Sequence, residues 1–146
     1  MDGTDPLLLR NQLCFPLYAA ARRITGAYTP LLKPLGLTYT QYIVLLALWE
    51  TDGQTVGGLC RRLRLDSGTL TPVLKRMEAD GRVLRARSWT DERSVVIRLT
   101  DAGKALREEA AAIPGKMADC VSLAPEEAAQ LYGLLYKIIG QGDGNP

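Results

Sequence analysis

The chain has 146 residues, 47% of them apolar and 23% charged, which predicts one globular domain large enough to bury a core. It contains no histidine and three widely spaced cysteines without a Cys-x-x-Cys pair, so histidine metal ligation, His-based acid/base catalysis and a disulfide framework are excluded. The net charge of +2 is unevenly divided: residues 54–99 carry 10 basic and 5 acidic side chains, residues 1–53 carry 4 and 4, and residues 100–146 carry 4 and 7. The basic middle block is typical of a nucleic-acid contact surface, although a solvated basic face would have the same composition.

The ends and the apolar runs of the chain indicate its compartment. The N-terminus is acidic, unlike the basic start of a secretory signal, and every apolar run is shorter than the roughly 18 residues that cross a bilayer. We therefore expect a cytoplasmic protein with no membrane partner, no metal and no cofactor.

The first predicted element is a long helix. From Leu17 to Tyr28, apolar residues recur at three- and four-residue intervals and form a stripe on one helix face. Pro16 lacks an N–H, so the helix either begins a few residues before it or is kinked there. In both cases Cys14 lies in or next to the first turn.

Three further helices follow in quick succession. Residues 38–49 begin with a Thr-x-x-Gln capping box and are strongly apolar. Residues 55–63 and 66–80 each begin with a good N-cap residue, threonine in the first and aspartate in the second. Gly81 then fits the position just past the end of a helix, where a left-handed backbone is favoured.

The remaining segments predict a hairpin and two more helices. Residues 83–87 and 94–99 have the pattern of two strands joined by a polar turn. Thr100 caps a helix over residues 101–118, and a proline followed by two glutamates opens the last helix, which spans residues 125–140. The fold class is therefore mainly α with a small β-hairpin wing.

This order of elements predicts a winged helix-turn-helix domain. In such a domain the second helix of the pair enters the major groove of DNA, and the hairpin lies along the backbone or in the adjacent minor groove. The alternative is that these side chains are only solvated charges. The candidate DNA contacts are Ser67, Thr69, Thr71, Lys75 and Arg76 on the helix and Arg87, Asp91 and Arg93 in the hairpin.

Five motifs along the chain form a recognisable set: Leu13-Cys14-Phe15-x-Leu17-Tyr18, Leu37-Thr38-Tyr39-x-Gln41-Tyr42, Leu65-Asp66-Ser67-Gly68-Thr69-Leu70-Thr71-Pro72-x-Leu74-Lys75-Arg76, Asp91-Glu92-Arg93 and Leu99-Thr100-Asp101-x-Gly103. Together they resemble the organic hydroperoxide resistance regulators of the MarR family, and the resemblance runs from about residue 7 to residue 139. The segment from Asp91 to Arg93 is shared by MarR proteins generally, whereas the segments around Cys14 and Asp66 are more specific to the organic hydroperoxide resistance branch.

The resemblance implies a single MarR-type domain over residues 1–146. Its winged helix-turn-helix would span about residues 38–100, and its dimerisation helices would span about residues 7–32 and 101–140. Two copies would form a homodimer that reads a palindromic stretch of double-stranded operator DNA.

The resemblance also implies that Cys14 is the peroxide-reactive thiol and that Tyr28 and Tyr39 hydrogen-bond its sulfur. Phenolic O–H donors and a helix N-terminus both favour thiolate over thiol, so the physical chemistry agrees. Without the resemblance, both tyrosines would be interpreted as core aromatics. Tyr18, one turn after Cys14, fits the same pocket and fits a core position equally well.

The other two cysteines have different expected roles. Cys60 lies on the apolar stripe of its helix and is interpreted as a buried structural thiol. Cys120 lies near the place where two-cysteine members of the family carry a resolving thiol, which bonds the oxidised sensor of the other subunit. If that bridge does not form, a low-molecular-weight thiol or over-oxidation would complete the change.

The function implied is a redox-sensing repressor that leaves DNA when an organic hydroperoxide oxidises Cys14. One alternative is a MarR-type repressor that responds to a non-covalent phenolic or aromatic ligand between its lobes. A thiol peroxidase is disfavoured because the predicted order of elements is not that of a redox fold, so we expect no enzyme activity.

Overall fold

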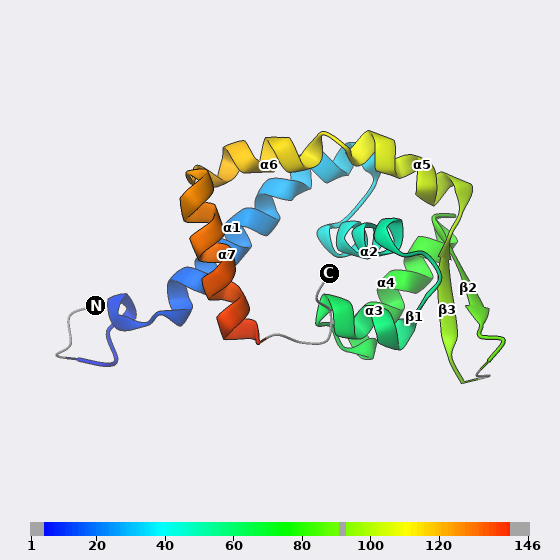
Figure 1. The fold of residues 1–146 in the computed structure, drawn as a ribbon, viewed down its shortest axis with the longest axis horizontal. Helices are drawn as coiled ribbons and strands as arrows, with labels where there is room; N and C mark the ends of the chain where they lie inside the picture. The colour runs from blue at the N-terminus through cyan, green and yellow to red at the C-terminus, as the bar shows by residue number, and fades with distance from the viewer. Residues whose placement is uncertain (1–4, 91–92, 141–146) are drawn as a thin grey trace.

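The structure is a computed structural model that describes residues 5–90 and 93–140. Its mainly helical architecture with a small antiparallel sheet confirms the predicted fold class (Figure 1). In chain order the elements are η1 (Leu9–Asn11), α1 (Cys14–Leu32), η2 (Lys33–Leu35), α2 (Tyr39–Glu50), β1 (Gln54–Thr55), α3 (Val56–Leu63), α4 (Ser67–Ala79), β2 (Val83–Arg87), β3 (Val95–Leu99), α5 (Asp101–Ala110), α6 (Ile113–Val121) and α7 (Pro125–Ile139).

The helices α2 to α4 and the sheet form one lobe, and α1, α6 and α7 form a helical arm beside it (Figure 1). Helix α1 runs alongside α6. The helix α5 joins the two parts, because it leaves the sheet at Thr100 and leads into α6. This arrangement puts the start of α1, whose first residue is Cys14, at the far end of the arm, away from the hairpin.

The core of the lobe is built around α2, which is apolar on nearly every side. Its residues Val44, Leu45 and Leu48 are fully buried and pack with buried leucines of α3 and α4. The predicted capping box is present: the Thr38 side chain accepts from the Gln41 N–H at 3.2 Å, and the Gln41 side chain accepts from the Thr38 N–H at 3.1 Å. These bonds satisfy two N–H groups at the helix start.

Within the described residues, no single helix is long and apolar enough to cross a bilayer. The segments Cys14–Leu35 and Tyr39–Glu50 meet the length and hydropathy requirement only together, and they are bent by 75° relative to each other. Since the second of them supplies much of the core, its apolar character is explained by packing.

The sheet contains a strand that the sequence pattern did not predict. The hairpin strands β2 and β3 pair antiparallel with Arg85 opposite Ile97, as expected, but the two-residue strand β1 adds to the other edge of β3. There Gln54 lies opposite Ile97. The sheet therefore ties the segment before α3 to the base of the hairpin.

The predicted single helix over residues 101–118 is wrong, because the chain forms α5 and α6 with a break at residues 111–112. Pro114 explains the break, since its ring would clash with the carbonyl of Ala110 in a continuous helix. In the structure Pro114 lies in the first turn of α6, where no N–H is needed. Pro16 also lies in the first turn of its helix, because α1 begins at Cys14, two residues before the proline, which is the first of the two predicted alternatives.

Candidate functional site

Cys14 is the first residue of α1 and is exposed, with a free thiol. The N-cap position, Leu13, makes no side-chain capping bond, so the first N–H groups of the helix are left without a side-chain acceptor. A helix N-terminus carries partial positive charge and favours an anion placed beside it. The thiol is therefore exposed at the N-terminal end of the helix, where a peroxide can reach it.

Tyr28 and Tyr39 lie together, with ring centroids 4.9 Å apart. Tyr42 joins them at 5.6 Å from Tyr28 and lies 6.5 Å from Trp49. Burial raises the pKa of Tyr28 and of Tyr42, and the neighbouring phenols raise it further. The Tyr28 and Tyr42 phenols consequently keep their protons at neutral pH and can act as O–H donors.

The structure does not bring Cys14 to this tyrosine cluster within one chain. Cys14 and Tyr28 are fourteen residues apart on the same helix, which at 1.5 Å per residue separates them by about 21 Å. The cluster lies where α1 meets α2, whereas Cys14 lies at the free end of α1 (Figure 1).

Tyr18 is one turn after Cys14 and therefore on the same face of α1. It is 59% exposed, so the core alternative does not describe this chain. Arg22 donates a 3.2 Å hydrogen bond to its phenol oxygen and lies 5.5 Å from its ring centroid. The pair is an exposed polar patch beside the thiol.

The two other cysteines are free as well. Cys120 is exposed in the last turn of α6, just before Ser122 ends the helix in a left-handed conformation with φ 55°. Cys60 is half-buried on α3 and packs against the core, which agrees with a structural thiol.

The candidate DNA surface is built on α4, called the reading helix from here on. Its inner face is anchored by Leu70, Leu74 and Met77, which are fully buried. The predicted N-cap is present, because the Asp66 carboxylate accepts from the Thr69 N–H at 2.7 Å and from its hydroxyl at 3.2 Å. These bonds lower the pKa of Asp66 below its ordinary value of 3.8, and the bond from the Thr69 backbone N–H has the largest effect.

The predicted contact residues of the reading helix lie on its outer face. Ser67, Thr69, Lys75 and Arg76 are exposed and Thr71 is half-buried. The Arg76 Nε lies 3.2 Å from an Asp80 carboxylate oxygen in an ion pair on the surface, and such pairs are weak enough to be exchanged for a phosphate.

The hairpin presents the remaining predicted contacts. Arg87, at the end of β2, and Arg93 are exposed, whereas Asp91 lies outside the described residues. The turn is closed by a 2.8 Å bond from the Ser88 N–H to the Ser94 carbonyl. Sequence reasoning did not single out Trp89, which is also in this turn and is fully exposed (102%).

The last sequence motif, Leu99-Thr100-Asp101-x-Gly103, is explained by the joint between the sheet and α5. The Thr100 hydroxyl accepts from the Gly103 N–H at 3.0 Å and donates to the Gly81 carbonyl at 2.7 Å. A Cβ on Gly103 would lie 2.1 Å from the Arg82 carbonyl oxygen, so only glycine fits. The Gly103 carbonyl accepts from Trp49 Nε1 at 2.9 Å, which fixes α5 on α2.

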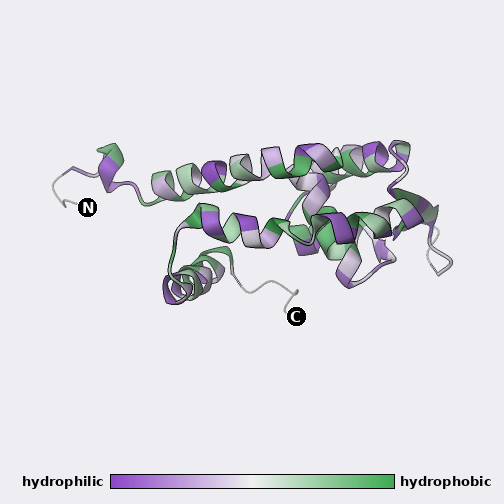
Figure 2. Cartoon of the chain, turned by 90° about the horizontal axis from the view of Figure 1, so that it is seen from above, coloured by the Kyte–Doolittle hydropathy of each residue, from purple (hydrophilic) through white to green (hydrophobic). Residues whose placement is uncertain are grey.

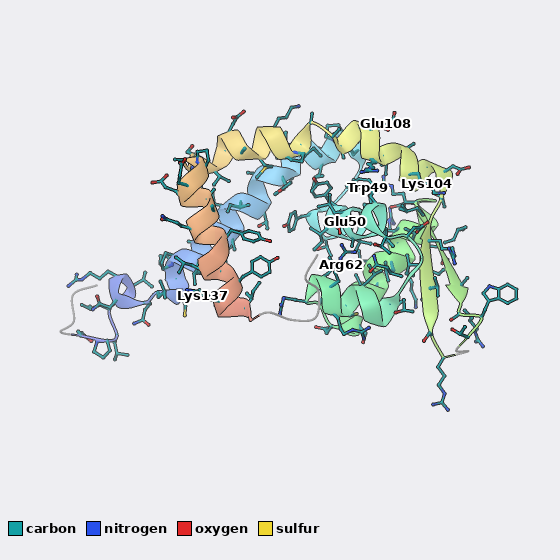
Figure 3. All side chains as sticks on the ribbon, in the orientation of Figure 1. Trp49, Glu50, Arg62, Lys104, Glu108 and Lys137 are labelled. Carbon is teal, nitrogen blue, oxygen red and sulfur yellow. The ribbon has the colours of Figure 1, made fainter. Side chains whose placement is uncertain are left out.

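A hollow of about 650 Å³ lies beside this joint. Trp49 and Lys104 line it from α2 and α5, and Arg107 and Glu108 add charge of both signs (Figure 3). On the other side of α2, the Glu50 carboxylate pairs with Arg62 of α3 (Figure 3). Sequence reasoning did not predict the hollow.

The comparisons with known proteins agree with this geometry. Residues 27–110 match the family model of the transcriptional regulator SarA/Rot. Over 135 residues the chain is 49% identical to the organic hydroperoxide resistance transcriptional regulator of Bacillus subtilis (strain 168), and the match covers 92% of each chain.

Two solved structures of AbfR, a protein of Staphylococcus epidermidis, are similar over most of the chain. Reduced AbfR bound to DNA is 40% identical with a TM-score of 0.74, and the match covers 90% of this chain and 91% of that one. Disulfide-formed AbfR is 41% identical with a TM-score of 0.64, covering 90% and 93%. The chain therefore belongs to the MarR-type winged-helix transcriptional regulators, in the family of the organic hydroperoxide resistance regulators.

Proposed function

We propose that this protein is a redox-sensing transcriptional repressor that binds operator DNA when reduced and releases it when an organic hydroperoxide oxidises Cys14. It acts as a regulator and not as an enzyme, in keeping with its relatives. The observation that carries the proposal is the exposed, free thiol at the start of α1, in a chain that belongs to the organic hydroperoxide resistance regulators.

The proposed chemistry begins at the sulfur of Cys14. The thiolate attacks the terminal oxygen of the hydroperoxide, the O–O bond breaks, and the other oxygen leaves as an alkoxide that takes a proton from water to become an alcohol. The sulfur is oxidised to a sulfenic acid. The thiol of Cys120 from a second copy then attacks that sulfur, a disulfide forms, and water leaves; a low-molecular-weight thiol is the alternative partner.

The exposed apolar residues of the helical arm support a homodimer. None of residues 125–139 is buried in the single chain, although α7 carries many hydrophobic residues (green in Figure 2). A contiguous apolar surface of this kind marks a protein contact. The exposed large apolar residues of α7 are Leu131, Tyr132, Leu134, Tyr136, Ile138 and Ile139.

The second copy would also complete the thiol site. Tyr28 and Tyr39 are about 21 Å along α1 from Cys14 of their own chain, so their O–H groups reach a sulfur only if a partner brings it to them. Tyr18 lies on the Cys14 face of the helix and would take part in the same contact. In this proposal, residues 7–32 and 101–140 form the dimerisation part, and residues 38–100 form the winged helix.

DNA binding is assigned to the outer face of the reading helix and to the hairpin. Ser67, Thr69 and Thr71 face base edges from the first turns, and Lys75 and Arg76 face the backbone. In the hairpin, Arg87, Asp91 and Arg93 position the wing along the DNA backbone or in the adjacent minor groove. Two reading helices in a dimer must lie about 34 Å apart to meet two half-sites. A disulfide that shifts the arms would change this spacing. To lower the occupancy of the operator from 99% to 1%, the oxidised dimer must bind DNA more weakly than the reduced dimer by roughly 5.5 kcal/mol.

Two measurements on the purified protein test this proposal. Operator binding of the reduced protein, followed by fluorescence anisotropy, should be lost on adding cumene hydroperoxide and restored by a dithiol. Non-reducing electrophoresis of the oxidised protein should show a covalent dimer that is absent in Cys120→Ser. Operator binding that is unchanged by the hydroperoxide would contradict the proposal.

A second candidate function is favoured by the hollow beside Trp49. A repressor released by a non-covalent phenolic or aromatic ligand could stack the ligand on the indole and pair an acidic group with Lys104 or Arg107. Such a protein would still release DNA in response to its ligand when Cys14 is replaced by serine. The redox-sensing protein would lose its response to the hydroperoxide in that variant, so Cys14→Ser separates the two candidates.

A further inference from the structure

The tip of the wing holds an aromatic side chain that the DNA contacts proposed above do not use. Trp89 is fully exposed in the turn between β2 and β3. Tryptophan is among the residues most enriched in binding interfaces, because its ring buries about 150–250 Å² and its N–H donates one hydrogen bond. We propose that Trp89 is a DNA-contacting residue that packs against the deoxyribose walls of the minor groove, an inference that rests on the function proposed above.

Backbone hydrogen bonds tie the chain next to Trp89 into the hairpin. The strands pair up to Arg87 opposite Val95, and the Ser88 N–H bonds to the Ser94 carbonyl one step further along. The Thr90 N–H then bonds to the Ser88 hydroxyl at 3.3 Å. Trp89 thus follows directly on the last hydrogen-bonded residue of β2's side of the hairpin, and its side chain is fully exposed.

The charges around the tip favour a nucleic acid as the occupant. Arg87 and Arg93 flank the turn and are exposed, and they belong to the basic block of residues 54–99. Minor grooves, narrow A·T tracts above all, attract arginine, and their walls are the apolar faces of the sugars. An indole between two arginines therefore matches a surface that is negative at its edges and apolar inside.

The position of the hairpin argues against a second copy of this chain as the occupant. The hairpin lies at the opposite end of the molecule from α7 and from the start of α1 (Figure 1). The exposed apolar residues of α7, which a second copy would cover, are therefore far from Trp89. The reading helix and the hairpin belong to the same lobe, so DNA that meets one can meet the other.

The contact predicts a contribution to affinity that does not depend on salt. Phosphate contacts release counterions, so they make the logarithm of the binding constant fall with the logarithm of the salt concentration. Packing on sugars releases no counterions and leaves this slope unchanged. The Trp89→Ala variant should bind more weakly at every salt concentration with an unchanged slope. Arg87→Ala, the matched control two residues away, should lower the slope.

The probe is a 30-base-pair duplex selected from random-sequence DNA by the reduced wild-type protein. We expect Trp89→Ala to bind this duplex about tenfold more weakly and Trp89→Phe to stay within about threefold, both with the wild-type melting temperature. The emission of Trp89, taken as wild type minus Trp89→Phe, should change when the duplex is added.

Three outcomes would overturn this inference: a Trp89→Ala affinity within twofold of wild type, a lowered salt slope in that variant, or an unchanged Trp89 emission. Failure of the wild-type protein to select any duplex would instead overturn the function proposed above. The two failures are therefore distinguishable.

Discussion

Arg64 and Gly140 are joined by a 2.9 Å hydrogen bond from the guanidinium to the Gly140 carbonyl, and a second bond of 3.1 Å reaches the carbonyl of Ile139. Arg64 ends α3 in a left-handed conformation with φ 53°, two residues before the N-cap of the reading helix. The bonds fasten the last carbonyls of α7 to the turn of the helix-turn-helix. We therefore expect a shift of α7 to be passed to this turn and, through it, to the reading helix.

Replacing Arg64 by glutamine should weaken the link between oxidation and DNA release. The loss of operator affinity caused by cumene hydroperoxide should shrink about fivefold, because couplings carried by such contacts are of order 1 kcal/mol. Arg61→Gln, an exposed arginine on the same helix, is the control for a lost phosphate contact. An equal affinity loss on oxidation in Arg64→Gln and wild type would contradict this link.

Replacing Gly103 by alanine should destabilise the joint between the sheet and α5. The added Cβ would lie 2.1 Å from the Arg82 carbonyl oxygen, which is backbone and cannot rotate away. We expect a loss of about 3 kcal/mol in the free energy of unfolding and a melting temperature lower by about 10 °C. Gly57→Ala, where the new Cβ meets only a flexible arginine side chain at 3.7 Å, should cost far less. Equal melting temperatures for the two variants would refute the close approach.

Acid should weaken the cap of the reading helix. The pKa of Asp66 is lowered below 3.8 in the folded protein by the bonds from Thr69, so their stabilisation is present above that pH and is lost as pH falls through the folded value. Asparagine caps equally well and does not titrate. As pH falls from 6 to 3, wild type should lose this stabilisation and Asp66→Asn should not. The urea midpoint of Asp66→Asn minus that of wild type should therefore increase. A constant difference would show that the bonds do not depend on the charge.

Loss of the Tyr28 hydroxyl should slow the oxidation of Cys14. In the proposed dimer this phenol donates to the sulfur, and a hydrogen bond to a charged group contributes about 1.5–3 kcal/mol, so Tyr28→Phe should react at least about tenfold more slowly. Stopped-flow measurement of thiol loss with cumene hydroperoxide gives the rate. Tyr132→Phe on α7 is the control, and an equal slowing in both variants would point to a general effect on the dimer.

The helix starts could be predicted from the sequence because each depends on residues close together in the chain. The caps at Thr38, Asp66 and Thr100 are all present in the structure. The strand β1 could not be predicted, since its two residues pair only with β3, more than forty residues later. The break in residues 101–118 was missed although Pro114 signals it.

In the candidate site, too, the features set by neighbouring residues could be predicted and those set by the packing of distant segments could not. That Cys14 starts a helix is a local property, and the sequence predicts it. The meeting of Tyr28 and Tyr39 depends on how α1 crosses α2, which no short pattern contains. Trp89 was missed because an exposed aromatic leaves no periodic signal, and only the structure shows it fully exposed.

The most direct test of the redox proposal is peroxide-induced release from operator DNA in Cys14→Ser. Wild type, Cys14→Ser and the control Cys60→Ala, which removes the half-buried thiol, are compared by anisotropy before and after cumene hydroperoxide. The proposal predicts equal operator binding by all three reduced proteins, and release by wild type and Cys60→Ala alone. Release of DNA by Cys14→Ser at the wild-type peroxide concentration would contradict it.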